Sequence, residues 1–195
     1  MTSVRLIVRP QRTPLSGSVP VPSDRSITHR ALIMAALSNG PCELRGFAYG
    51  NDNLGTLRAV SSLGVRCEDD QKGTVRIRGV GLAGLKASSG EIDCGHSPTT
   101  ARLLTGVLAG QPFRSRLVGS AGNSRRRMAA IVAPLRERGA SISGAAHPAD
   151  AADLSLPLEI GPLTEGQRLG AIEYRMSRPN DHAKGALLFL SLIHI

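Results

Sequence analysis

The pattern of apolar and polar positions along the chain predicts strands and helices in alternation. Apolar runs that follow a small polar residue are expected to be buried helix faces, because small polar residues cap helix N-termini. In chain order we expect strands at 16–22, 42–47, 65–68, 74–78, 91–94, 113–118, 140–143, 154–160 and 170–174, and helices at 26–37, 53–63, 97–109, 124–138 and from Asn180 onward.

These expected elements follow a repeating order. Strand, helix, strand, helix, strand, strand (βαβαββ) occurs in a unit at about 14–85 and again at 86–165, and each unit ends in a connection that contains Gly or Pro. A third unit, 166–195, holds one strand and one helix. The sequence therefore predicts an α/β fold of repeated βαβαββ units in a single domain, 1–195, whose third unit is incomplete.

The end of the chain lies inside the apolar run 187–195, where no helix stop signal occurs. We therefore expect the chain to be truncated. Residues 190–195 also resemble translated sequencing-adapter read-through.

Three of the expected helices have a basic residue about one turn after the small polar residue that opens them. The pairs are Ser26 with Arg30, Ser97 with Arg102, and Asn180 with Lys184. A helix N-terminus presents unpaired backbone N–H groups and the positive end of the helix dipole. A basic side chain nearby makes it an anion site, so the repetition predicts a small polyanionic ligand.

The amino-acid composition indicates the kind of core and the kinds of ligand to expect. Hydrophobic residues make up 41% of the chain but aromatic residues only 3%, which predicts an aliphatic core. The net charge is +9, and among the 24 basic residues only Lys72, Lys86 and Lys184 are lysines. Arginine suits the recognition of phosphate and carboxylate groups. The charge also leaves nucleic-acid binding open, although aromatic residues for stacking on bases are nearly absent.

We expect no metal site, no dinucleotide-binding site and no secreted or membrane-spanning protein. Cys42, Cys67 and Cys94 lack the spacing of a zinc site or a disulfide framework, so we expect no metal. Residues 79–84, GVGLAG, match a dinucleotide-binding fingerprint, but no helical pattern follows them, and we expect a flexible connection. The sequence has no signal peptide and no apolar run long enough to span a membrane, so we expect a cytoplasmic protein.

Longer motifs carry a family resemblance. Residues 19–32 read VPVPSDRSITHRAL, residues 93–104 read DCGHSPTTARLL, and residues 125–128 (RRRM) are followed by APLRERGA at 133–140. In this order, the segments resemble the three substrate-binding motifs of the 5-enolpyruvylshikimate-3-phosphate synthases. The similarity extends from Gly17 to about Phe189.

The resemblance implies two similar domains, each of three βαβαββ units with helices packed inward, and this chain resembles the first. It implies transfer of the enolpyruvyl group of phosphoenolpyruvate to the 5-hydroxyl of shikimate 3-phosphate, a step in aromatic amino acid biosynthesis, without metal or organic cofactor. The family's catalytic acids lie in the second domain and have no counterpart here. We therefore expect the chain alone to be inactive, and the complete protein to be a monomer.

The first and third motifs imply site residues. Ser26 and Arg30 match residues that hold shikimate 3-phosphate, and Arg126 matches an arginine that binds phosphoenolpyruvate. Arg25 stands where the family has a lysine that contacts both substrates and assists at the reacting centre. Arginine keeps the charge but cannot release a proton, so we expect Arg25 to impair turnover more than binding.

The chain matches the second motif at Thr99 and Arg102 but differs from it at two earlier positions. His96 replaces an Asn, and Pro98 replaces a Gly near which phosphoenolpyruvate binds. Because Pro98 has no N–H and adds a ring, we expect weaker binding of phosphoenolpyruvate.

The helix from Asn180 also departs from the family. Asn180, Asp181 and His182 replace a Ser-Ala-Gln or Ser-Ser-Gln triplet that hydrogen-bonds both substrates. Asp181 adds a negative charge beside the expected anion site.

Two other functions stay open at this point. The substitutions at Arg25, His96, Pro98 and His182 favour a non-catalytic homologue that binds a phosphorylated metabolite. The net charge of +9 is compatible with an RNA-binding or RNA-end-processing protein of related fold.

Overall fold

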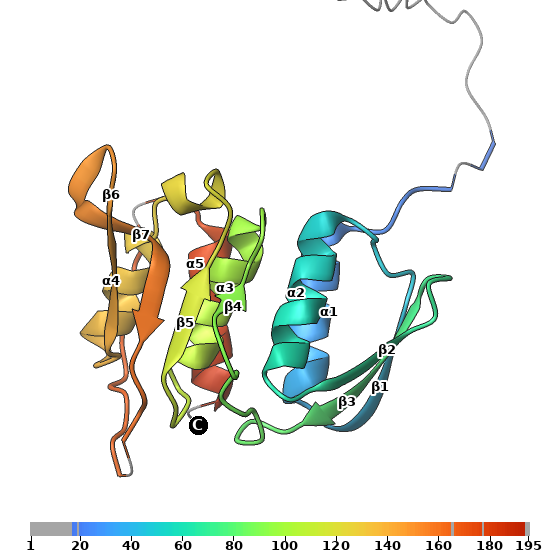
Figure 1. Ribbon diagram of the computed structural model, residues 1–195, viewed down its shortest axis with the longest axis horizontal. Helices are drawn as coiled ribbons and strands as arrows, with labels where there is room; N and C mark the ends of the chain where they lie inside the picture. The colour runs from blue at the N-terminus through green and yellow to red at the C-terminus, as the bar shows by residue number, and fades with distance from the viewer. Residues whose placement is uncertain (1–16, 19, 165, 177, 194–195) are drawn as a thin grey trace, which may run out of the picture.

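Helices packed against one another form the inside of the molecule, and two sheets cover them (Figure 1). The computed structural model describes residues 17–18, 20–164, 166–176 and 178–193. Its helices are α1 (Arg25–Leu37), α2 (Asn51–Ser62), α3 (Pro98–Leu108), α4 (Ala129–Glu137) and α5 (Asp181–Ile193), with a short 3-10 helix η1 (Asn123–Arg125). The first sheet covers α1 and α2, and the second covers α3 and α4.

The two sheets share one strand order. The first contains β1 (Asn39–Arg45), β3 (Thr74–Val80) and β2 (Arg66–Asp69), in that order and antiparallel. The second contains β4 (Ile92–Asp93), β5 (Ser115–Val118), β7 (Asp150–Ile160) and β6 (Ile142–His147), in that order. The order β5-β7-β6 repeats β1-β3-β2, and β4 adds a parallel strand beside β5. The expected α/β fold of repeated units with inward helices is confirmed.

The core between the sheets is aliphatic, as expected from the composition. Leu32 of α1, Leu104 of α3 and Leu117 of β5 are fully buried or nearly so. Within the described part of the chain, no helix combines the length and the apolar character that a membrane crossing requires.

Two expected strands are wrong. The described residues of 16–22 form no strand, and this segment contains Pro20 and Pro22, which have no N–H to donate to a sheet. Residues 170–174 form no strand either, because Gly170 is bonded to the end of α4 instead. Its N–H donates to the carbonyl of Arg138 over 2.8 Å, and the Arg138 side chain donates to the carbonyl of Gly170 over 2.9 Å.

The helix expected at 124–138 is shorter than the sequence pattern indicates. Its first residues form η1, and α4 begins only at Ala129. The reason is the buried carboxylate of Asp153 on β7, whose Oδ1 accepts the N–H of Ala129 over 2.7 Å and so caps the helix from a distant strand. Asp153 also lies 3.4 Å from the guanidinium of Arg127, which holds that residue outside the helix.

Two of the three expected caps are confirmed. The Ser97 side chain accepts the N–H of Thr100 at the start of α3, and the Asn180 side chain accepts the N–H of Ala183 at the start of α5. The cap of α1 is Asp24 rather than Ser26, because Oδ1 of Asp24 accepts the N–H of Ile27 over 2.6 Å.

The contact between α3 and α5 is unusually close and requires a glycine. A Cβ atom on Gly106 would overlap the backbone carbonyl of Ala186. This close approach seats α5 on α3, and the two N-termini are thereby held side by side.

Gly106→Ala is expected to lower the free energy of unfolding by about 1–3 kcal/mol or more, because backbone rather than a flexible side chain opposes the new methyl group. Urea unfolding followed by circular dichroism measures the loss. Gly122→Ala is the matched control, since a Cβ there meets nothing within 4 Å and the residue has a φ of −71°. Equal stability of the two variants would contradict the close α3–α5 contact.

Candidate anion-binding site

Helices α1, α2, α3 and α5 all begin at the same end of the molecule, the upper end in Figure 1. Hydrogen bonds join the first three of these N-termini. The Asn53 side chain of α2 donates to the carbonyl of Arg25 over 3.1 Å. The Thr100 hydroxyl of α3 lies 3.5 Å from the carbonyl of Asp52. The three helix starts therefore form one connected group.

The start of α5 completes this group. Oγ1 of Thr99 on α3 lies 3.0 Å from Nε2 of His182 on α5. The Arg30 guanidinium of α1 donates to the carbonyl of Asp181 over 3.4 Å. Thus α5 contacts both α1 and α3 at their N-terminal ends, although it lies far from both in the sequence.

A buried chain of polar side chains lies beneath these helix starts. Nδ1 of His29 is 2.6 Å from Oγ1 of Thr56, which is 2.6 Å from Oγ1 of Thr100. The Thr100 hydroxyl in turn donates to Oγ of Ser97 over 2.9 Å. His29 is 2% exposed and the other three are fully buried, so water cannot replace these bonds. The chain therefore fixes α1, α2 and α3 relative to one another.

Burial determines the charge state of His29. It lowers the pKa of His29 to about 4, with Arg30 and Arg25 acting in the same direction and Asp52 against them. The imidazole is therefore neutral at pH 7 and can share hydrogen bonds with Thr56 without adding a buried charge.

Three arginines near the helix starts have no carboxylate partner among the described residues: Arg30, Arg102 and Arg126, which we call the arginine cluster. Among the residues that the structure describes, Arg30 bonds only to the carbonyls of Ser26 and Asp181, and Arg102 only to the carbonyl of Arg127. Burial, followed by the charge of Arg126, lowers the pKa of Arg102. Within the described part of the chain, the three guanidinium groups thus have no ion-pair partner, which is what an anion site requires.

The arginines on either side of the cluster are compensated. The exposed guanidinium of Arg25 lies 3.9 Å from the carboxylate of Asp52. Arg127 is paired with Asp150 over 2.8 Å as well as with Asp153. Within the basic run 125–127, Arg127 therefore serves the fold, whereas Arg126 has no ion pair among the described residues.

The N-terminus of α3 offers fewer backbone donors than a usual helix start. Pro98 is the first helical residue and has no N–H, and the N–H of Thr100 donates to the Ser97 side chain. Among the first three residues of α3, only Thr99 has an N–H without a partner in the described part of the chain. The start of α3 thus has one backbone donor fewer, and the weaker binding of phosphoenolpyruvate stays a prediction.

The remaining expected site residues lie at the same end of the molecule. Ser26 is exposed, and its carbonyl accepts from Arg30. His96 is exposed just before α3, and Asn180 is engaged as the cap of α5. The carboxylate of Asp181 is exposed, while its carbonyl binds Arg30.

Sequence reasoning missed the residues that support this site. Thr56, Thr100 and Asn53 are fully buried, and Oδ1 of Asn53 has no hydrogen-bond partner among the described residues. Small polar residues at buried helix positions were the available signal, but nothing local in the sequence pairs Thr56 with His29, which lies 27 residues away.

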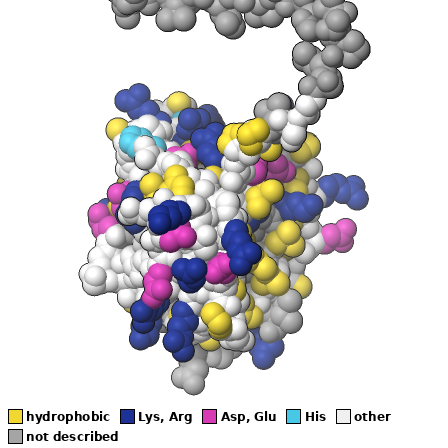
Figure 2. Space-filling model, turned by 90° about the vertical axis from the view of Figure 1, so that its right-hand side faces the viewer, with side chains coloured by type: hydrophobic (Ala, Val, Ile, Leu, Met, Phe, Trp, Pro, Cys, Tyr) yellow, Lys and Arg dark blue, Asp and Glu magenta, His cyan; other side chains and the backbone are white. Residues whose placement is uncertain are grey.

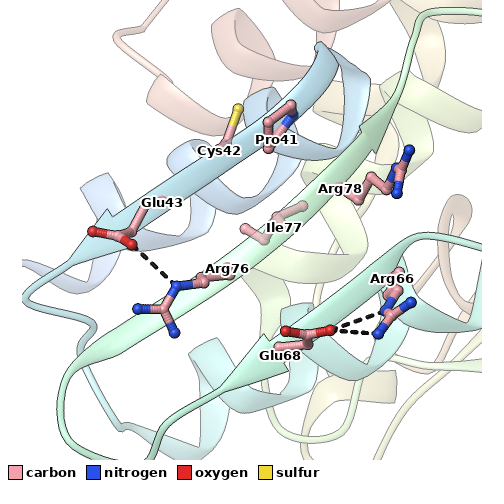
Figure 3. Close-up of a pocket in the computed structure, with 8 residues that line it drawn as sticks. All are labelled: Pro41, Cys42, Glu43, Arg66, Glu68, Arg76, Ile77 and Arg78. Atoms are coloured by element: carbon pink, nitrogen blue, oxygen red, sulfur yellow. Dashed lines mark hydrogen bonds and ion pairs between the residues drawn. The ribbon is translucent and has the colours of Figure 1, made fainter.

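A hollow of about 570 Å³ lies elsewhere, on the outer face of the first sheet (Figure 3). There Arg76 is paired with Glu43 over 3.1 Å, and Arg66 with Glu68 over 2.7 Å. Figure 2 looks onto this side of the molecule and shows basic and acidic side chains interspersed. We interpret this face as a solvated set of ion pairs, one across β3 and β1 and one along β2, rather than as a binding site.

Two other sequence features can now be placed. Residues 79–84 follow the end of β3, and no helix begins between them and β4, so the dinucleotide fingerprint lacks its helix. In the described part of the chain, His, Cys, Asp and Glu side chains form no group of three or more that could hold a metal ion.

Comparison with known proteins identifies the family. Residues 10–194 match the family model of EPSP synthase (3-phosphoshikimate 1-carboxyvinyltransferase). The chain belongs to this family. It is 44% identical over 188 residues to the 3-phosphoshikimate 1-carboxyvinyltransferase of Acidithiobacillus ferrooxidans, and 39% identical over 180 residues to that of Enterococcus faecalis.

A solved structure of EPSP synthase from Acinetobacter baumannii has the same fold, with a TM-score of 0.81 and 36% identity. This match covers 89% of the present chain and 37% of that one. The match to the A. ferrooxidans protein covers 96% of this chain and 41% of that protein. The match to the E. faecalis protein covers 91% of this chain and 40% of that protein. The chain thus spans about two fifths of the length of these EPSP synthase relatives.

The neutral state of His29 predicts acid sensitivity. Between its unfolded pKa of about 6.5 and its folded pKa of about 4, the unfolded chain binds a proton that the folded protein does not. Stability should therefore fall as the pH is lowered through this range, by about 3 kcal/mol in total from this residue. His29→Gln should lose less stability than the parent between pH 7 and pH 4.5 in urea unfolding.

The control for this measurement is His96→Gln, at an exposed site without recorded hydrogen bonds. It should show the same acid sensitivity as the parent. An unchanged pH dependence in His29→Gln would mean that His29 takes up its proton over the same pH range in the folded protein as in the unfolded chain.

Proposed function

We propose that this chain supplies the shikimate 3-phosphate side of a 3-phosphoshikimate 1-carboxyvinyltransferase. The complete reaction transfers the enolpyruvyl group of phosphoenolpyruvate to the 5-hydroxyl of shikimate 3-phosphate and releases phosphate. The observation that carries the proposal is the arginine cluster at four helix N-termini, with no carboxylate partners among the described residues. Membership of the EPSP synthase family supports it.

The chemistry of the substrate fits this end of the molecule. Shikimate 3-phosphate has a phosphate and a carboxylate, and each favours guanidinium donors and helix N-termini. In our proposal Ser26 and Arg30 hold this substrate, and Asn180, Asp181 and His182 line the site from α5. Arg30 reaches the start of α5 through the Asp181 carbonyl, so both helices can contact one ligand.

The second substrate would contact the other side of the arginine cluster. We assign Arg126, Thr99 and the segment of His96 and Pro98 to phosphoenolpyruvate, and Arg25 to contact with both substrates. The donor missing at Pro98 weakens this part of the site relative to the shikimate 3-phosphate part. The catalytic acids expected in a second domain would complete the reaction.

The organisation of the chain in the enzyme is part of the proposal. We place residues 1–195 in a single enolpyruvyl-transferase domain, with repeat units at about 14–85, 86–165 and 166–195. The equivalent strand orders of the two sheets support the first two units. We further propose that the complete protein is cytoplasmic and monomeric, which size-exclusion chromatography of that protein would test.

A second function is favoured by the α3 N-terminus. With one free N–H among its first three residues, it is less suited to an incoming phosphate than an uninterrupted helix start. A non-catalytic protein that binds one phosphorylated metabolite would tolerate this loss. Phosphoenolpyruvate binding separates this alternative from the enzyme.

Arg30→Ala tests the first proposal. Loss of charge-assisted bonds to a phosphate or carboxylate is expected to weaken shikimate 3-phosphate binding about ten- to a hundredfold in isothermal titration calorimetry. Arg78→Ala is the matched control, because Arg78 lies on the outer face of β3 without a recorded ion pair and carries the same charge (Figure 3). Equal affinities of the two variants would place the ligand elsewhere.

Pro98→Gly tests the assignment of phosphoenolpyruvate. Restoring an N–H at the first position of α3 should raise phosphoenolpyruvate affinity about tenfold or more, measured calorimetrically with shikimate 3-phosphate already saturating. Pro112→Gly, in an exposed turn, controls for the general effect of losing a proline. If Pro98→Gly binds no better than the parent, the missing donor does not limit this substrate.

A further inference from the structure

His182 connects the start of α5 to the start of α3. It lies in the first turn of α5, half-buried, with Nε2 3.0 Å from the Thr99 hydroxyl of α3. Its Nδ1 has no recorded partner among the described residues, so one ring nitrogen is available to a ligand. The neighbouring carbonyl of Asp181 binds Arg30, which brings a guanidinium to the same turn.

The charges around His182 come from several elements. Arg30 of α1 and Arg102 of α3 face it with positive charge, His29 of α1 is neutral, and Asp181 of α5 itself is negative. On the side of α4, Arg138 contacts Ser191 toward the opposite end of α5. Burial, and then Arg102 and Arg30, lower the pKa of His182, while Asp181 opposes them. The free site therefore contains a neutral imidazole between two guanidinium groups.

We propose that His182 takes up a proton from solvent when a dianionic phosphate ligand occupies the arginine cluster, so that affinity for this ligand rises as the pH falls through neutrality. This inference rests on the proposed function for the identity of the ligand. No covalent bond changes: one solvent proton moves to an imidazole nitrogen, and the side-chain charge goes from zero to +1.

The physical cause is that a bound dianion reverses the electrostatic effect of the surroundings on His182. A dianion placed among Arg30 and Arg102 neutralises the repulsion that disfavours imidazolium and adds an attraction of its own. The Thr99 hydroxyl permits both states, because it can donate to a neutral Nε2 or accept from a protonated one. Glutamine, the residue that the family resemblance places here, would hydrogen-bond the ligand but could not titrate.

The thermodynamic linkage between proton uptake and ligand binding sets the size of the change in affinity. Where one proton is taken up on binding, affinity changes by up to about tenfold per pH unit. We expect shikimate 3-phosphate to bind about three- to tenfold more tightly at pH 6.0 than at pH 7.5, beyond any change shown by His182→Gln. The comparison with this variant is needed because a phosphate monoester itself titrates near pH 6.

The first experiment is calorimetric titration of the chain with shikimate 3-phosphate at pH 7.0, in two buffers that differ in ionisation enthalpy. The difference in heat between the buffers counts the protons taken up. The parent should take up more protons than His182→Gln, and Arg78→Ala, on the outer face of β3, should match the parent. His29 should not contribute, because its pKa of about 4 lies below this range.

A second measurement observes the imidazole directly. Ring resonances of His182, assigned by their loss in His182→Gln, are titrated between pH 5 and pH 8 with and without sulfate. Sulfate is a suitable probe because it stays dianionic across this range. An upward shift of the His182 pKa in sulfate is expected.

The outcomes separate the two proposals. Saturable shikimate 3-phosphate binding with equal proton uptake in parent and His182→Gln would overturn the role of His182 and leave the proposed function intact. Absence of shikimate 3-phosphate binding by folded protein would overturn the proposed function. A sulfate-dependent shift of His182 in that second case would keep the proton-coupled anion site and assign it to a different phosphorylated ligand.

Discussion

The buried hydrogen-bond chain from His29 through Thr56 and Thr100 to Ser97 is the constraint on which the rest of the site depends. It crosses from α1 to α2 to α3 directly beneath their N-termini. Each member is buried, so a shift of one helix would leave a polar group without a partner, at about 1–3 kcal/mol. The helix starts are therefore held together by bonds that water cannot replace, and the anion site is organised before any ligand arrives.

Four converging helix starts and three arginines would repel one another if nothing anionic entered. Arg30 and Arg102 reduce this repulsion by donating to backbone carbonyls, which accept hydrogen bonds without cancelling charge. Carboxylates pair with arginines at the margins of the site, where Asp52 lies near Arg25 and Asp153 holds Arg127. The arrangement stabilises the protein while leaving a positive potential for a polyanionic substrate.

Departures from the family motifs change the parts of this site unequally. Pro98 removes a backbone donor from α3, yet it suits the first position of a helix and leaves the helix itself well formed. His182 stands where the family resemblance implies an uncharged hydrogen-bonding side chain, and its charge depends on its surroundings. Arg30, which matches the family motif, is retained and donates to the carbonyls of Ser26 and Asp181. A ligand would therefore meet a site of retained positive charge with altered donors on one side.

The sequence by itself determined the repeated α/β pattern, the apolar helix faces and the basic residues at the helix starts, because these depend on spacing and capping within one element. It failed for 170–174 and for the start of α4, where Gly170 meets Arg138 and Asp153 caps Ala129. Such bonds join residues distant in sequence, and no local pattern encodes them. For the same reason only the tertiary structure decided which arginines stay unpaired, since Arg126 and Arg127 are neighbours in sequence but only Arg127 reaches Asp150 and Asp153.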